Sequence, residues 1–409
     1  MKIKIIKILI LLFFISCNEH KETDPIPQID ITSGIERKEK VNLSEIATHI
    51  EYVQLESNET SLLDRIDTPK KDVQFVDEYV LIKDVSNRLF LFYRSGAFIR
   101  NIGNLGRGPE EYADIENFTF FNENQLIAIH SSSKQKVFVY SLDGQFVSSF
   151  DIGFWPLGLT NFQNEFVFLN NIGRRSLTDY YSLSFFSAKG SLQRRLLYKG
   201  NEKRYEKTKK LGIKTLNMNS FVLNDTLRHW EGNYGTDTIW SITKKHETIP
   251  SYTINFDSNL KKIDFFQENK QIGFNEMTKN SSLTDYQEST RFLFFELYYA
   301  KDGRLRKIVY DKTSNESASV QYKREFKQGF HFSFYNDIDG GMPFWPQGKT
   351  SDDKMYMIVH GYELKDYIAK KGADFDAIDK AGRNKLLKLI GESKISDNPI
   401  LMIVTLKDK

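Results

Sequence analysis

Short apolar stretches rich in Phe, Tyr, Val, Ile and Leu recur along this chain at intervals of about 45–50 residues. Each stretch reads as a strand that is followed by a tight turn ending on Gly and by a second strand. The pattern is clear at residues 89–100, 137–147, 183–192 and 296–305. Because this interval is the length of one blade, the repeat predicts an all-β fold, a β-propeller rather than a sandwich.

We predict six blades, of which five follow one another along the chain. They cover about residues 70–103, 113–153, 156–200, 215–257 and 283–325, and the fourth is the least regular. An unpaired edge strand favours aggregation, so the sixth blade is expected to combine both ends of the chain. In that blade a strand at 50–55 would pair with the closing strand at about 399–406.

Helical spacing interrupts the last blade. Between residues 361 and 392 the apolar positions recur every three or four residues, which predicts a short helical insertion of one or two helices. The positions are Leu364, Tyr367, Ile368, Leu386, Leu387 and Ile390. A shorter helical turn, capped by Asn42 or Ser44, is expected just before the 50–55 strand.

The N-terminus has the features of a bacterial export signal. Three lysines within the first seven residues precede an apolar segment at 8–15 that is too short to cross a bilayer comfortably. Ser16 and Cys17 follow, and the segment resembles a lipoprotein signal, in which cleavage precedes a cysteine that carries diacylglycerol. We therefore expect a signal peptide at 1–16, a flexible tether at 17–28 after lipidated Cys17, and the propeller at 29–409. The alternatives are an ordinary signal peptide with a free thiol, or a short N-terminal anchor.

Composition and charge narrow the class of protein further. Cys17 is the only cysteine, so an exported form contains no internal disulfide. The formal net charge is +3, and the three lysines of the leader account for it. The mature chain is therefore neutral, and no nucleic-acid partner is expected.

Three segments carry a resemblance to a known family. They are NLSEIATHIEYVQLE at 42–56, IGNLGRGPEEY at 102–112 and NDIDGGMPFWP at 336–346. With the leader and the Asn398-Pro399 ending, they resemble the six-bladed β-propeller lipoproteins of Bacteroidetes, whose blades are similar to NHL repeats. The resemblance implies an exported protein that is anchored in the cell envelope, mostly without an assigned activity. We expect the outer membrane, with the periplasmic or surface face left open.

A glycine-rich segment at 103–108 invites comparison with a phosphate-binding loop. The comparison fails, because a P-loop requires Lys-Ser or Lys-Thr opening a helix, and Pro109 leads here toward a strand. An inter-blade loop is the simpler interpretation. Loops at one face of a propeller channel usually bind the ligand. We therefore predict that Arg107 and Tyr112 belong to a ligand face, where Arg107 could bind an anion or pair with a neighbouring Glu.

The same ligand face is predicted to include Asp337, Asp339 and Trp345. A calcium loop is disfavoured, because Gly341 stands where the next oxygen ligand would be needed. A turn stabilised by the Asp side chains fits better. Trp345 is interpreted either as an exposed platform for a sugar ring or peptide, or as a cover for the end of the core.

No catalytic constellation is evident. The seven histidines are dispersed without zinc-site spacing, there is no Gly-x-Ser-x-Gly elbow, and Cys17 is committed to lipid. We predict no catalytic residue, no metal and no cofactor. The leading hypothesis is a membrane-anchored module that binds an envelope protein, peptide or glycan. The alternatives are an NHL-like hydrolase or lyase with a metal in the central channel, and a structural subunit of an outer-membrane assembly.

Overall fold

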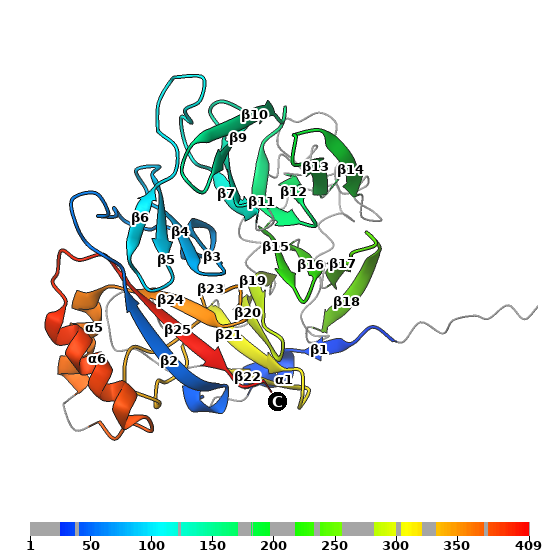
Figure 1. Cartoon of the computed structure of the whole chain (residues 1–409). Helices are drawn as coiled ribbons and strands as arrows, with labels where there is room; N and C mark the ends of the chain where they lie inside the picture. Colours follow the sequence, from blue (N-terminus) through cyan, green and yellow to red (C-terminus); the bar gives the residue numbers. More distant parts are fainter. Residues whose placement is uncertain are drawn as a thin grey trace, which may run out of the picture.

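The computed structural model forms a ring of six β-sheets (Figure 1), so the predicted six-bladed all-β propeller is confirmed. The structure describes residues 25–36, 41–121, 124–170, 181, 183–196, 217–232, 238–255, 282–299, 304–320, 333–371 and 375–408. The leader, with Cys17, lies outside these residues.

Blades 1 to 3 each contain four antiparallel strands that follow one another in sequence. Blade 1 contains β3 (Val73–Val76), β4 (Tyr79–Lys83), β5 (Leu89–Tyr93) and β6 (Phe98–Asn101). Blade 2 contains β7 (Asn117–Phe121), β8 (Leu126–Ser131), β9 (Lys136–Ser141) and β10 (Phe146–Asp151). Blade 3 contains β11 (Pro156–Phe162), β12 (Glu165–Asn170), β13 (Leu183–Ser187) and β14 (Leu192–Leu196).

Blades 4 and 6 both receive a strand from the N-terminal region. Blade 4 contains β15 (Asn217–Leu223), β16 (Thr226–Gly232), β17 (Thr238–Ile242), β18 (Thr248–Asn255) and, outermost, β1 (Gln28–Asp30). Blade 5 contains β19 (Ser282–Glu288), β20 (Phe292–Tyr299), β21 (Arg304–Asp311) and β22 (Glu316–Ser319). Blade 6 contains β23 (Gly348–Lys349), β24 (Met355–Val359), β25 (Ile400–Leu406) and, outermost, β2 (Ala47–Gln54).

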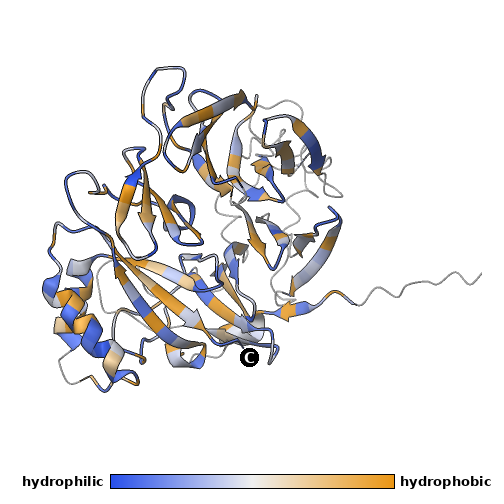
Figure 2. Ribbon diagram, in the orientation of Figure 1, coloured by the Kyte–Doolittle hydropathy of each residue, from blue (hydrophilic) through white to orange (hydrophobic). Residues whose placement is uncertain are grey.

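Packing between neighbouring blades explains why so many strands are apolar on both faces. Side chains alternate along a strand, so Val80 packs toward blade 6 while Leu81 packs toward blade 2. Six hydrophobic clusters lie at the six interfaces around the ring. Figure 2 shows the apolar residues concentrated in the strands, where both faces are buried.

The ring closes where both ends of the chain meet in blade 6. β2 pairs antiparallel with β25, and Tyr52 lies opposite Met402, so the predicted partner strand at 50–55 is in place. Asn398 strengthens this closure from a position with 2% exposure. Its side-chain oxygen accepts from Leu63 N at 2.8 Å, and its Nδ2 donates to the carbonyls of Glu56 and Ser61 at 2.6 and 2.8 Å.

A second N-terminal connection crosses blade 5 and was not predicted. β1 pairs in parallel with β18 of blade 4, and α1 (Thr32–Glu36) then packs against β21 and β22 before the chain reaches β2. Ile29 and Ile31 are fully buried, and Ser317 Oγ donates to the Asp30 carbonyl at 2.6 Å. We call residues 28–36 the N-terminal strap. It joins blades 4 and 5 before the chain enters blade 6.

The predicted helical insertion lies between β24 and β25. It consists of α5 (Gly361–Lys371) and α6 (Lys380–Glu392), the latter capped by Asp379, whose carboxylate accepts from Gly382 N at 2.8 Å. Figure 1 shows both helices against the outside of blade 6. Within the part of the chain that the structure describes, no helix is long and apolar enough to span a membrane.

Strand direction divides the connections between two ends of the propeller. Each blade has four main strands that alternate in direction, so a chain that enters a blade at one end also leaves it there. We call this the loop end; it carries the inter-blade connections and the helical insertion. The turns after the first and third strands lie at the opposite end, which we call the hairpin end. The first strands of blades 2 to 5, β7, β11, β15 and β19, contact one another in succession, which places them nearest the axis.

Candidate functional site

The glycine-rich loop at 103–108 is built around Glu111. Gly108 N donates to Glu111 Oε2 at 2.8 Å, and a Cβ on Gly106 would lie 2.0 Å from that oxygen. Lys134 Nζ donates to the carbonyls of Gly108 and Glu111 at 2.9 and 2.5 Å. Gly103 has a φ of +62°, as expected of an inter-blade loop. The loop therefore satisfies its own polar groups, and Arg107 remains exposed at its tip.

Tyr112, predicted for the ligand face, is a core residue. Its side chain is 2% exposed within the cluster between blades 1 and 2, and its hydroxyl donates to the Ile102 carbonyl at 3.3 Å. Its ring meets Tyr140 edge-to-face with centroids 6.2 Å apart. Burial raises the pKa of Tyr112 to about 12. This placement leaves the ring no surface for a ligand, and it leaves Arg107 as the exposed candidate of this loop.

Asp337 and Asp339 stabilise local structure, as the turn interpretation anticipated. Asp337 accepts from Ser44 N at 3.0 Å and from Ser44 Oγ at 2.5 Å, and so holds the helical turn η1 (Leu43–Glu45). Asp339 is 1% exposed and accepts from Asn336 Nδ2 at 2.7 Å and from Gly341 N at 2.8 Å. Burial raises the pKa of Asp339 despite these bonds. Both carboxylates are therefore occupied by the protein itself.

Trp345 covers the end of the core, the second of its two predicted interpretations. It is 5% exposed, stacks on Phe334 with centroids 5.9 Å apart, and meets Phe294 edge-to-face at 5.8 Å. The Lys307 ammonium lies 4.9 Å from the ring centre. Arg107 and Tyr112 belong to the connection between blades 1 and 2, whereas Asp337, Asp339 and Trp345 belong to the connection between blades 5 and 6. They form two separate groups, one between blades 1 and 2 and one before blade 6.

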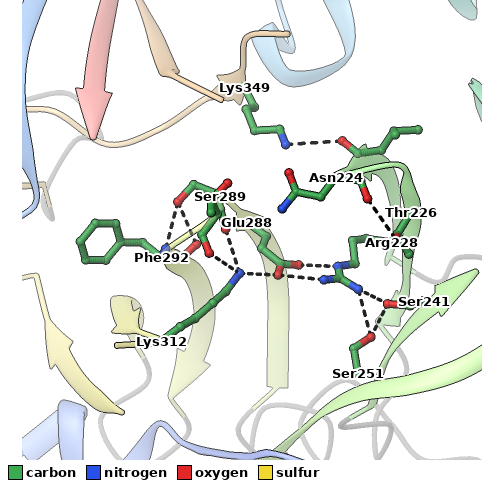
Figure 3. A network of polar contacts seen from close by, with 12 residues as sticks. Asn224, Thr226, Arg228, Ser241, Ser251, Glu288, Ser289, Phe292, Lys312 and Lys349 are labelled. Carbon is green, nitrogen blue, oxygen red and sulfur yellow. Dashed lines mark hydrogen bonds and ion pairs between the residues drawn. The ribbon is translucent and has the colours of Figure 1, made fainter. Parts of the chain in front are cut away.

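Charged side chains gather instead at the hairpin end, where blades 4, 5 and 6 meet. We call Arg228, Glu288, Lys312, Lys349 and Asp353 the charged network. Figure 3 shows its first four members. Glu288 ends the first strand of blade 5 and Lys349 ends that of blade 6. Arg228, Lys312 and Asp353 lie in turns or near the starts of strands at the same end. Strand topology therefore brings together residues from 228 to 353.

Glu288 lies at the centre of the network. Its side chain has 0% exposure and contacts two cations: Arg228 Nε at 3.1 Å from Oε2, and Lys312 Nζ at 2.6 Å from Oε1. A carboxylate buried this deeply is tolerated only when paired and hydrogen-bonded. Removing either cation would take away one of the two ion pairs that compensate this buried charge. Glu288 therefore fixes the positions of Arg228 and Lys312.

Arg228 and Lys312 have little capacity left for other partners. Arg228 Nη1 donates to the hydroxyls of Ser241 and Ser251, while Nε and Nη2 face Glu288. Lys312 uses its three N–H bonds on Glu288 and on the carbonyls of Ser289 and Thr290, the last two at 2.8 and 3.2 Å. Burial lowers the pKa of Lys312, although the Glu288 carboxylate opposes the change.

Lys349 is held far more loosely. Its ammonium lies 3.4 Å from the Val222 carbonyl and 3.4 Å from Asp353 Oδ1, both near the outer limit for a hydrogen bond or close ion pair. Burial lowers the pKa of Lys349, and the positive charge of Lys312 adds to that shift. With three cations and two carboxylates, the network carries one excess positive charge.

Sequence reasoning missed this network because its members look like ordinary charged residues of strands and turns. The available signal was Glu288, a carboxylate at the end of a strand whose neighbours are buried. Its partners become visible only once the ring is assembled. Among the described residues, no group of three or more His, Cys, Asp or Glu is arranged to hold a metal ion.

Comparison with known proteins agrees with this architecture. The model of one family, "Domain of unknown function (DUF4934)", matches residues 26–405. No curated protein matches the chain. A crystal structure described as a "Putative exported protein" from Bacteroides fragilis NCTC 9343 overlays with a TM-score of 0.68 and 18% sequence identity. The overlay covers 94% of this chain and 100% of that chain.

Two further solved structures overlay less well. A member of the DUF4221 family from Bacteroides vulgatus ATCC 8482 has a TM-score of 0.47 and 8% identity, covering 88% of this chain and 97% of that chain. A virginiamycin B lyase from Staphylococcus aureus has a TM-score of 0.37 and 13% identity, covering 66% and 74%. At 18% identity, the similarity to the Bacteroides fragilis structure extends to the fold alone.

Proposed function

Because the chain belongs to the DUF4934 family and folds as a six-bladed propeller, we propose that it is a non-catalytic binding module of the bacterial cell envelope. It takes a peptide, glycan or protein ligand. The lipid on Cys17 holds it to a membrane, which we place as the outer membrane. The export signal in the sequence and the description of the Bacteroides fragilis structure support this location.

The observation that carries the binding proposal is the charged network at the hairpin end. It combines a deeply buried Glu288, which orders its neighbours, with partly exposed cations at the same end of the blades. Ordered polar groups of this kind at the mouth of a ring of blades are what ligand recognition requires.

The anchor is tested by membrane fractionation of cells that produce Cys17→Ala. Loss of the acyl chains removes the main hydrophobic attachment, so we expect the variant in the soluble fraction and the wild-type protein in the membrane fraction. Ser16→Ala keeps a small residue before the cysteine and serves as a matched control that stays with the membrane. A Cys17→Ala variant that fractionates with membranes would contradict lipid anchoring.

Binding is tested with the mature protein, screened by thermal shift against envelope peptides, glycans and protein fractions. A specific ligand stabilises the folded state and raises Tm by an amount that grows with the logarithm of its concentration over Kd. We expect such a rise with the ligand recovered unchanged. Chemical conversion of the ligand would contradict the non-catalytic part of the proposal, and the absence of any stabilising ligand would contradict the binding part.

A further inference from the structure

The charged network differs from an ordinary structural ion-pair cluster in how unevenly its cations are engaged. Arg228 and Lys312 each have several short contacts with protein acceptors. Lys349 has two contacts, both at 3.4 Å, while its side chain is 18% exposed. An ammonium group has three N–H bonds to donate. Lys349 is thus the cation of this network with donor capacity to spare.

The groups that surround the Lys349 ammonium favour the binding of an anion. Its ammonium lies 5.7 Å from the centre of the Phe221 ring, so one side of it is apolar. Asn224, in the turn between β15 and β16, is exposed and points its side-chain amide toward the same region (Figure 3). Partial burial lowers the local dielectric, which strengthens any charge-assisted hydrogen bond formed there.

The net charge of the network sets the charge of its ligand. Arg228, Lys312 and Lys349 contribute three positive charges, and Glu288 and Asp353 contribute two negative charges. A monoanion neutralises the remaining charge, whereas a dianion leaves an uncompensated negative charge beside Glu288. A carboxylate is the common monoanion that accepts planar hydrogen bonds from an ammonium and an amide.

We propose that Lys349, with the Asn224 amide, binds the carboxylate of a ligand at the hairpin end of the channel. This inference rests on the proposed binding function and specifies the chemistry of its ligand. Glu288, Arg228 and Lys312 take no direct part in the contact; they hold the positive field in place. The carboxylate belongs either to a peptide C-terminus or to an acidic sugar.

The test uses the full mature protein and calorimetric titration with matched probes. Acetyl-trialanine with a free carboxyl is compared with its C-terminal amide, and D-galacturonate is compared with D-galactose. We expect binding of one acid, little or no binding of its neutral partner, and weaker binding of inorganic phosphate. The peptide and sugar arms distinguish the two sources of the carboxylate. If neither acid binds, or if acid and neutral forms bind equally, the inference is wrong.

Substitution of Lys349 locates the contact. A hydrogen bond between charged groups typically changes affinity by about tenfold or more, so Lys349→Ala should weaken acid binding about tenfold. Lys349→Arg keeps the charge and should retain most of the affinity. Lys244→Ala is the matched control: Lys244 lies at the same end, is 61% exposed and is paired with Asp225 at 2.7 Å. It should bind like the wild type.

The outcomes separate this inference from the proposed function. Far-ultraviolet circular dichroism and thermal unfolding first establish that Lys349→Ala is folded, as its two long contacts lead us to expect. If an envelope ligand from the thermal-shift screen binds Lys349→Ala as tightly as the wild type, the carboxylate site is refuted while the binding module stands. If no ligand binds the wild type, the binding module itself is refuted.

Discussion

At the scale of single residues, burial governs the chemistry of His130. This residue lies on β8 with 1% exposure, and neither of its ring nitrogens has a hydrogen-bond partner. It faces blade 3, because its neighbours on the same side of the strand pack against that blade. Burial lowers the pKa of His130 to about 4, although the Asp114 carboxylate opposes the change. The folded protein therefore keeps His130 neutral far below neutral pH.

This histidine predicts a pH-dependent stability. The unfolded chain protonates His130 near its ordinary pKa of about 6.5, whereas the folded protein does so only near pH 4. Between these values the unfolded state binds more protons, so stability falls as pH falls. Over the whole window the loss amounts to about 3 kcal/mol. Urea unfolding of the wild type and of His130→Gln at a series of pH values measures it.

The difference between the two proteins is the informative quantity, because carboxylates also titrate in this range. The free energy of unfolding of His130→Gln should therefore fall less steeply than that of the wild type as the pH is lowered from 6.5 to 4. His49→Gln is the control, since the His49 side chain is 56% exposed, and it should reproduce the wild-type profile. Parallel profiles for the wild type and His130→Gln would show that His130 is not buried in its neutral form.

The roles of individual residues in the candidate site were the hardest feature to predict from the sequence. Tyr112, Asp339 and Trp345 have side chains that serve ligands and cores equally well. Their roles depend on which neighbours the fold supplies: Tyr140, Tyr52 and Phe334 respectively. The sequence pattern within residues 103–112 and 336–346 does not indicate which residues these side chains will contact in the fold. The turn at Asp339 was nevertheless readable, because it is stabilised by residues close in sequence.

At the scale of secondary-structure elements, the N-terminal strap makes the next prediction. Gly34 in α1 lies so close to β22 that a Cβ would meet Ser317 Cβ at 2.8 Å and its carbonyl carbon at 3.1 Å. Because backbone cannot yield easily, Gly34→Ala should push the strap outward and destabilise the protein by about 2 kcal/mol. Urea unfolding measures the loss, and hydrogen exchange should increase in β1.

A matched glycine substitution provides the control. Gly391 lies in the last turn of α6, and a Cβ added there would meet no atom within 4 Å, so Gly391→Ala adds helix propensity without a clash. It should be neutral or stabilise by up to about 1 kcal/mol. Equal effects of the two substitutions would mean that the strap does not pack tightly against blade 5.

Elements differed in how well the sequence predicted them. The hairpins of blades 1 to 3 were readable because strand, turn and strand are adjacent, and Gly96 and Gly144 adopt the positive φ that their turns require. The insertion was readable because helical spacing extends over two helices. The strap was not, since β1 has three residues and α1 has five, too few to show periodicity, and its partner strand β18 is more than two hundred residues away.

At the scale of the whole molecule, the residues that stabilise the ring are different from those of the charged network. Six inter-blade clusters and the pairing of β2 with β25 stabilise the ring. The repeat and the closure could both be predicted from sequence, because a propeller must bury both faces of every blade. The charged network could not, because it joins side chains from three blades that only the closed ring brings together.

The central claim is that this propeller binds its ligand at the hairpin end, through the charged network. Hydrogen–deuterium exchange of the mature protein, with and without the ligand that raises Tm most, tests it directly. The account predicts slower exchange in peptides that cover residues 222–228, 288–291 and 349–353. Protection confined to residues 103–112 and 333–347, the connections that hold the five residues predicted from the sequence, would contradict it.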